Sequence, residues 1–254
     1  MMRGIALLIL CGAALALVLT GCEGERGPAG PAGYNPIEVM GSLRYHPSPV
    51  VPFTFFSLEV QGSPTIPSVS LNGEDYAMAF NSTQNAFTCN YPVMTFSPGD
   101  SVVIEIDYVK NNGDPGVARI RSLIPAPAEP IVPLSPIAWG GDLVWNWLSV
   151  PGADGYDVYF SHHCRYSDTL GIPQDYYWSC HEITTDTVLT FSAADLWPAD
   201  MAALHGPQPT YAELRAYPIN GPFLPGEPGN VTGDGTGFFT CTVDTDPVTI
   251  EFTD

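Results

Sequence analysis

The sequence predicts an all-β fold of two β-sandwich domains in tandem, placed after an N-terminal export signal. Its 254 residues include 26 prolines and 25 glycines, and only 14% of them are charged. Short runs of alternating apolar residues are separated by turn residues at intervals typical of antiparallel sandwiches, and long amphipathic helical patterns are hard to find. The length beyond the signal suffices for one large domain or for two sandwich-sized domains with their own cores.

Residues 1–21 form the predicted signal. Met1-Met2-Arg3 is followed by an uncharged stretch from Gly4 to Leu19, and the segment ends in Leu19-Thr20-Gly21-Cys22. A positive start, an apolar centre and a small residue before the cleavage point are the layout of an export signal. The stretch is too short, and its flanks are wrong, for a helix that remains in the membrane.

The end of this signal resembles the lipobox of bacterial lipoproteins, [Leu/Val/Ile]-[Ala/Ser/Thr]-[Gly/Ala]-Cys. The resemblance implies cleavage before Cys22, lipid on its sulfur and an acyl chain such as palmitate on the new N-terminus. Several chains, at about 0.8 kcal/mol per buried methylene group, would hold the protein permanently on a membrane. The expected location is the bacterial cell envelope, at the outer membrane or the cell surface. An ordinary signal peptide cleaved nearby is the alternative.

Residues 22–36 are predicted to be a spacer. Gly24, Gly27, Gly30 and Gly33 recur at every third position, which is a collagen-like register. Three triplets are too few to hold a triple helix, so the sequence favours an extended, polyproline-like spacer of about 3 Å per residue. A trimerising collagen stub is the alternative.

The first sandwich is predicted over residues 37–124. Two runs alternate with polar neighbours and can each bury one face of a strand: Phe56, Leu58 and Val60, and Val102, Ile104, Ile106 and Tyr108. Asn72-Gly73 indicates a hairpin because both residues accept positive φ, and Ser97-Pro98-Gly99-Asp100 indicates a turn. An immunoglobulin-like sandwich of seven or eight strands fits this pattern.

Residues 125–136 contain repeated prolines and mark the predicted boundary between the domains. Proline cannot donate to a central ladder, so the segment is either a stiff extended connector or the edge strand that opens the next domain.

The second sandwich is predicted over residues 137–254. Leu143, Trp145 and Trp147 alternate, then comes the turn Val150-Pro151-Gly152-Ala153-Asp154-Gly155, and Tyr156, Val158 and Phe160 alternate again. This segment resembles the fibronectin type III family, in which an alternating run ending in Trp precedes Pro-Gly-Ala-x-Gly-Tyr-x-Val-Tyr.

The fibronectin-like resemblance covers residues 137–243 and implies that Trp147 is the core tryptophan and that Tyr156 and Val158 point inward. Leu196-Trp197-Pro198 resembles the family's Leu-x-Pro corner, and Ala212, Leu214 and Ala216 resemble its inward strand near the C-terminus. The chain departs from the pattern at an insertion through Met201–Gln208 and at Tyr211, which is one position off the inward alternation.

Four cysteines follow Cys22. In an oxidising compartment an even number of cysteines usually pairs. We expect a local Cys164–Cys180 disulfide, which would close a loop worth about 3 kcal/mol in the chain-entropy model. Cys89 and Cys241 fall in different predicted domains, so they are either an interdomain disulfide or two buried thiols.

A metal site is the competing interpretation of the same loop. Two thiols and several imidazoles occur together and could make a tetrahedral site, and these residues are His162, His163, Cys164, Cys180 and His181. The spacing differs from that of common structural zinc sites, so we expect the disulfide and neither metal nor cofactor. Gly229–Gly237 has oxygen donors for calcium but lacks the Asp-x-Asp-x-Asp-Gly order, which favours a flexible loop.

Tyr176, Tyr177 and Trp178 lie within this loop. We expect the three rings to point outward as the contact surface, for example as a platform for a sugar ring. The alternative is that they fold back over the sandwich.

Charge and motifs narrow the function. The formal net charge is −19, with 27 acidic and 8 basic residues, which excludes nucleic acid as a default partner. No nucleophile elbow, phosphate loop or His-Glu-x-x-His pattern occurs, so we expect no enzyme. The sequence favours an envelope lipoprotein that acts as a binding or spacer module for an unknown protein or glycan. The alternatives are a carbohydrate-binding module and a periplasmic metal-binding protein that use the residues named above.

Overall fold

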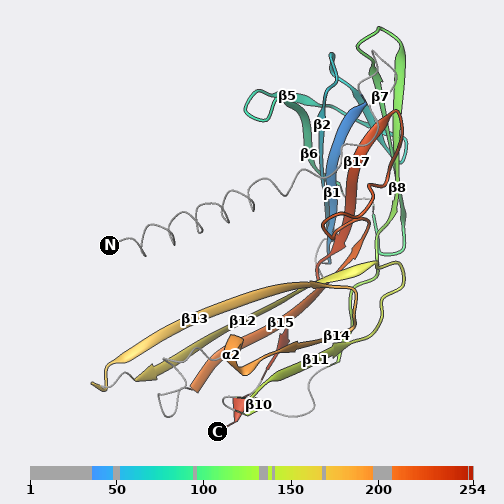
Figure 1. Cartoon of the computed structure of the whole chain (residues 1–254). Coiled ribbons are helices and arrows are strands. Elements are labelled where there is room, and N and C mark those ends of the chain that lie inside the picture. The colour runs from blue at the N-terminus through green and yellow to red at the C-terminus, as the bar shows by residue number, and fades with distance from the viewer. Residues whose placement is uncertain are drawn as a thin grey trace, which may run out of the picture. The chain divides into compact units, whose positions relative to one another are not determined.

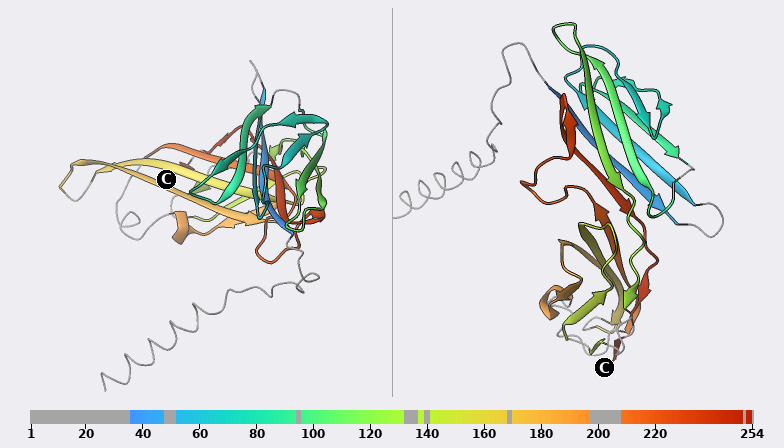
Figure 2. Two further views of the ribbon diagram at one scale, coloured as in Figure 1. Left: turned by 90° about the horizontal axis from the view of Figure 1, so that it is seen from above. Right: turned by 90° about the vertical axis from the view of Figure 1, so that its right-hand side faces the viewer.

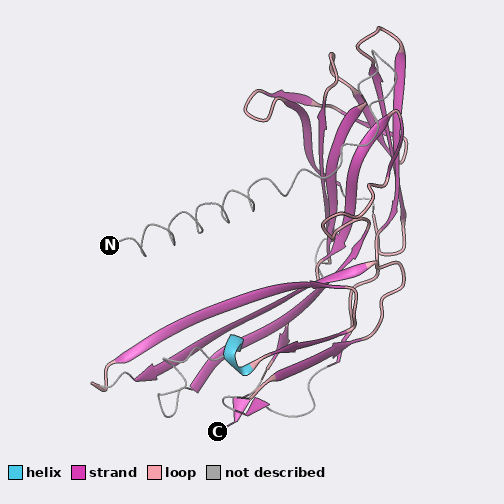
Figure 3. Cartoon of the chain, viewed as in Figure 1, coloured by secondary structure: helices cyan, strands magenta, loops and turns pink. Residues whose placement is uncertain are grey.

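The protein is all-β, as predicted, and its sheets form sandwich-like arrangements (Figures 1 and 3). The computed structural model describes residues 36–47, 52–93, 96–131, 137–138, 141–167, 170–196, 208–250 and 252–253. Within these ranges the only helix is the single turn α2 (Ala193–Leu196), and no helix there has the length and apolar character needed to cross a membrane. The predicted signal, Cys22 and the spacer up to residue 35 lie outside the described residues.

Residues 36–254 form one compact unit. Its largest sheet contains, in spatial order, β13 (Pro173–Thr184), β12 (Gly155–Ser167), β15 (Gln208–Asn220), β17 (Gly235–Val243), β1 (Ile37–His46), β2 (Phe53–Gln61), β6 (Ala86–Val93) and β5 (Ala79–Asn81), and β18 (Val248–Thr249) pairs with β15.

Three smaller sheets complete the unit. The second sheet has the order β16 (Val231–Gly233), β8 (Pro115–Leu123), β7 (Ser101–Val109), β3 (Ser68–Leu71) and β4 (Glu74–Tyr76). The third has the order β14 (Val188–Phe191), β11 (Leu143–Trp147) and β9 (Pro130–Ile131), and the last joins β10 (Ile137–Ala138) to β19 (Phe252–Thr253).

The first hydrophobic core forms between the β1-β2-β6 part of the largest sheet and the β8-β7-β3 sheet. The alternating residues of β2 and β7 that the sequence indicated point inward, and each is at most 5% exposed. The turns agree as well: Asn72 and Gly73 both have positive φ, 50° and 85°, and Asp100 donates from its N–H to the Ser97 carbonyl at 3.1 Å. These predictions of local structure are confirmed.

The second core gathers side chains from β11, β12 and β15. Leu143, Trp145 and Trp147 are 1–2% exposed, and the ring of Trp147 packs edge-on against Tyr156 with centroids 5.2 Å apart. The inward positions of Val158 and Leu214 are confirmed too. The Leu-x-Pro corner at Trp197 and the side chain of Tyr211 lie outside the described residues.

The strand β17 belongs to the first core, which corrects the predicted domain boundaries. It runs parallel to β1, from the pair Ile37 and Gly235 to the pair Tyr45 and Val243 (Figures 1 and 2). The preceding strand β16 pairs with β8. The inward side chains of β17 are therefore buried with the first core, and the second core is completed by Val248 and Ile250 instead. The first core is thus built from two segments, residues 37–124 and 231–243, rather than one.

A glycine allows this pairing. Gly237 has φ of 128°, and a Cβ atom there would collide with the carbonyl oxygen of Val39 on β1. Only glycine combines this backbone conformation with so close an approach. The segment expected as a flexible loop, Gly229–Gly237, therefore includes β16 and the start of β17.

Part of the proline-rich segment is an edge strand, which was one of the two predicted alternatives. This part is β9, which forms the edge of the third sheet beside β11. Residues 132–136 are outside the described ranges.

Asn220 links the end of strand β8 to the turn before β12. Its Oδ1 accepts hydrogen bonds from Ser122 Oγ at 2.6 Å and the Leu123 N–H at 2.9 Å. Its Nδ2 donates to the Gly152 carbonyl at 2.9 Å and to Asp154 Oδ2 at 3.1 Å. One side chain therefore connects residues of the two cores across about 70 to 100 positions of the sequence.

Candidate functional site

The region that the sequence assigned to a functional loop is a long β-hairpin. β12 and β13 pair antiparallel along their whole length, from Tyr156 with Thr184 to Ser167 with Pro173. Successive side chains of these strands point to opposite faces of the sheet. This alternation decides where each predicted site residue lies.

The expected Cys164–Cys180 disulfide is not supported by this register. Cys164 is opposite Tyr176, whereas Cys180 is opposite Phe160. The two cysteines are thus four rungs apart, about 13 Å along the strands, whereas the Cα atoms of a disulfide lie within about 7 Å. The register of the hairpin therefore keeps the two cysteine Cα atoms apart.

The predicted aromatic surface is also divided between the two faces. Trp178 turns inward and packs against the second core, with its ring centroid 5.6 Å from that of Phe160. Tyr177 points outward and is 73% exposed. The side chain of Tyr176 lies outside the description. The expectation that all three rings point outward is therefore wrong for Trp178.

The histidines separate in the same way. His162 is buried at 2% exposure beside Phe160 and Trp178, and burial, together with the charge of His163, lowers its pKa to about 4. His163 points outward, stacks on Tyr177 with centroids 4.1 Å apart, and holds Asp175 Oδ1 3.0 Å from its Nε2.

His181 is on the outer face as well, but near the other end of the hairpin. Its Nδ1 lies 3.5 Å from Asp157 Oδ1. His162 therefore faces the core while His163 and His181 face outward four rungs apart, and the described residues hold no group of three or more metal-ligating side chains. The alternative of a metal centre is not supported by this arrangement.

The outer face of the largest sheet carries a groove that the sequence did not reveal. One hollow of about 390 Å³ is lined by outward residues of five strands and the loop after β17: Arg44, Asp157, Tyr159, His181, Tyr217, Ile219, Thr242 and Asp244. A second hollow of about 300 Å³ is lined by the outward residues Tyr159, Ser161, His163, Tyr177 and Ser179, and also by the inward-facing His162 and Trp178. Tyr159 lines both hollows, so it lies where they meet.

Arg44 and Asp244 form an ion pair at one end of the groove. Asp244 is also in hydrogen-bond contact with His46 Nδ1, and the Arg44 guanidinium lies 5.6 Å above the centre of the Tyr217 ring. On β15, Arg215 Nη2 lies 2.9 Å from Glu213 Oε2. The groove therefore presents phenol, imidazole and carboxylate groups, and its arginine is paired with Asp244.

The candidate calcium ligand Asp234 has a structural role instead. Its Oδ1 lies 3.0 Å from Lys110 Nζ, and its Oδ2 accepts from the Val117 N–H at 3.1 Å. Its carbonyl accepts from the Tyr108 hydroxyl at 2.7 Å. These contacts hold the connection between β16 and β17 on the β7–β8 hairpin.

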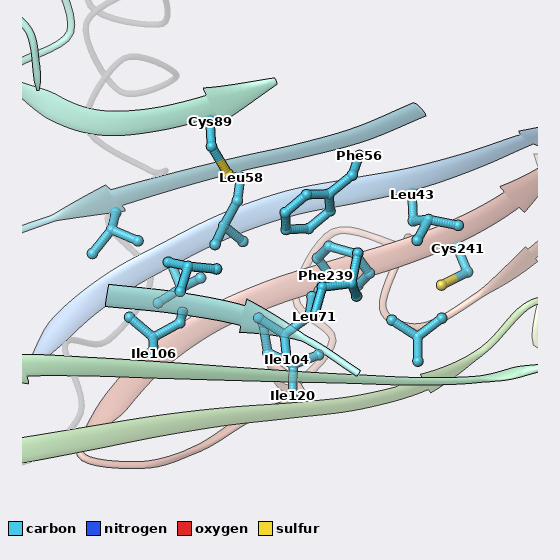
Figure 4. Packing of buried hydrophobic residues seen from close by; sticks show 14 of the residues in the cluster. Leu43, Phe56, Leu58, Leu71, Cys89, Ile104, Ile106, Ile120, Phe239 and Cys241 are labelled. Atoms are coloured by element: carbon cyan, nitrogen blue, oxygen red, sulfur yellow. The ribbon is translucent and has the colours of Figure 1, made fainter. Parts of the chain in front are cut away.

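The remaining two cysteines are free thiols in the first core. Cys89 is 3% exposed and Cys241 is fully buried, and they lie on different strands, separated by other core side chains (Figure 4). Burial raises the pKa of Cys89 to about 11 and that of Cys241 to about 12. Of the two alternatives, the structure shows the pair of buried thiols.

No family model matches the chain, and no curated protein is significantly similar to it. The described residues show an all-β protein with a tyrosine-lined surface groove.

Proposed function

We propose that the protein is a lipid-anchored component of the bacterial cell envelope that acts without catalysis, as a binding or spacer module. The observation that carries the proposal is the uncharged segment ending in Leu19-Thr20-Gly21-Cys22, which resembles a lipoprotein signal. A lipid on Cys22 would hold the compact β unit at a membrane through the spacer of residues 22–36.

Two features support a non-catalytic role. The buried thiols of Cys89 and Cys241 have raised pKa values and little access to solvent, so neither is suited to act as a nucleophile. The ionic groups of the groove are held in pairs, such as Arg44 with Asp244, which favours passive recognition over proton transfer.

The second core is proposed to be a fibronectin type III-like sandwich. Trp147 and Tyr156, the two residues that the resemblance places in its interior, are 2% and 3% exposed and in ring contact. Its last strand would be β18 rather than β17, because β17 belongs to the first core.

Replacing Cys22 tests the anchor. The variant Cys22→Ser should lose labelling by radioactive or clickable palmitate and should leave the membrane fraction, while Cys11→Ser, a matched change inside the predicted signal, should behave like the parent. The fractions should be washed with high salt and carbonate before blotting. Retention of Cys22→Ser in the washed membranes would show that Cys22 is not the anchor.

A further inference from the structure

We infer that the groove on the outer face of the β13-β12-β15-β17-β1 sheet binds a neutral oligosaccharide, with Tyr159 at the centre of the site. This inference rests on the proposed binding role and names the class of ligand. It centres the site on Tyr159, and of the Tyr176–Trp178 segment it uses Tyr177 as an outward ring.

Three outward tyrosines form a row along the groove. Tyr159 is the middle one, on β12. Tyr177 of β13 is opposite His163, which is four positions after Tyr159. Tyr217 of β15 is opposite Asp157, which is two positions before Tyr159. At about 3.3 Å per residue the row spans about 20 Å along the strands. This length, and the two hollows that meet at Tyr159, fit an extended chain of several rings better than a single small molecule.

Tyrosine suits a sugar because the ring offers an apolar face and the hydroxyl a polar tip. Hydrogen-bonding groups lie next to the tyrosines: Asp157, whose side chain is 41% exposed, and His181, whose side chain is 68% exposed. Ser161 and Ser179, which are paired across the hairpin, add hydroxyl groups beside Tyr159. Such a surface can match the alternating apolar and hydroxyl faces of a pyranose.

The electrostatics favour an uncharged ligand. Asp244 is already paired with Arg44 and in hydrogen-bond contact with His46, and Asp157 Oδ1 lies 3.5 Å from His181 Nδ1. An anion or a cation would have to compete with these pairs, whereas hydroxyl groups can bond to the outer lone pairs and N–H groups without separating them.

The groove lies on a sheet face, which argues against a polypeptide as ligand. The main-chain groups of β12 are engaged on both sides, with β13 and with β15. An extended peptide gains affinity mainly from main-chain pairing at a sheet edge, and a face offers it only side chains. A ligand recognised by side chains and ring stacking is therefore the better fit.

The test applies the full-length protein, in detergent micelles, to an array of neutral polysaccharides, and then uses calorimetry with oligosaccharides from any polymer that binds. Tyr159→Ala should weaken binding at least about tenfold, and Asp157→Asn should weaken it measurably. The control Tyr91→Ala removes a tyrosine that is 37% exposed on β6, away from the groove, and should leave binding unchanged. Binding should persist at about 0.5 M salt because the ligand is uncharged.

Four results would reject the inference. They are absence of binding to any neutral glycan, equal binding by the parent and both groove variants, loss of binding at high salt, and binding only to an unstructured peptide. Asp157→Asn is nearly isosteric and keeps the test decisive if Tyr159→Ala fails to fold, which thermal melting reports. Membrane fractionation of cells that express Cys22→Ser tests the anchor separately and involves no glycan. Absence of glycan binding therefore does not bear on the lipid anchor, and failure of the anchor does not bear on the groove.

Discussion

Protonation of the buried His162 should make stability fall with acid. Its folded-state pKa of about 4 lies below the ordinary value of 6.5, because burial opposes the charged form. Between these values the unfolded chain binds a proton that the folded chain does not. The stability that comes from keeping His162 neutral is therefore fully present above pH 6.5 and is lost as pH falls toward 4. A difference of about 2.5 units, at 1.36 kcal/mol each, corresponds to about 3 kcal/mol.

Urea unfolding of the parent and of His162→Gln at about pH 7.5, 5.5 and 4 measures this effect. The parent should lose about 3 kcal/mol more than the variant between the highest and the lowest pH. The control His181→Gln removes an imidazole whose side chain is 68% exposed, and it tests whether the effect requires a buried ring. If His162→Gln loses stability with acid as steeply as the parent, His162 is not the buried neutral group that the structure shows.

Three further outcomes are expected. Trp147→Ala should lower the free energy of unfolding by about 3–5 kcal/mol, measured by urea titration, because the ring is 2% exposed in the second core, and a loss under 1 kcal/mol would contradict this placement. Asn220→Ala removes four hydrogen bonds and should cost about 2–4 kcal/mol in the same assay, whereas an unchanged midpoint would show that these bonds add nothing. Cys89 and Cys241 should resist iodoacetamide at about pH 8 in the folded protein and react fully in urea, and mass spectrometry that found rapid labelling of the native state would refute their burial.

Local patterns determined much of the fold from the sequence alone. The period of two in β2, β7, β11 and β12 indicated both the strands and their buried faces, because a half-buried strand must alternate. Asn72-Gly73 indicated its hairpin for an equally local reason, since both residues tolerate positive φ. The same local logic placed Trp147 in a core.

The tyrosine groove needed knowledge of strand neighbours. Tyr159 and Tyr217 occupy outward positions of two alternating segments, which was visible in the sequence, but nothing local indicated that these segments would be adjacent. The outward positions of strands could have been searched for aromatic residues once the pairing was known.

Only the tertiary structure decided which sheet β17 joins and which way Trp178 points. The alternation in β17 buries one face equally well in either core, so the choice depends on its pairing with β1, about 200 positions earlier in the chain. Trp178 differs from Tyr177 in direction only because the segment is a strand in register with β12, whereas a loop would have allowed both to face outward. Alternation is a property of one segment, but pairing and register arise from contacts between distant segments, and for this reason the sequence determined the strands and the tertiary structure determined the groove.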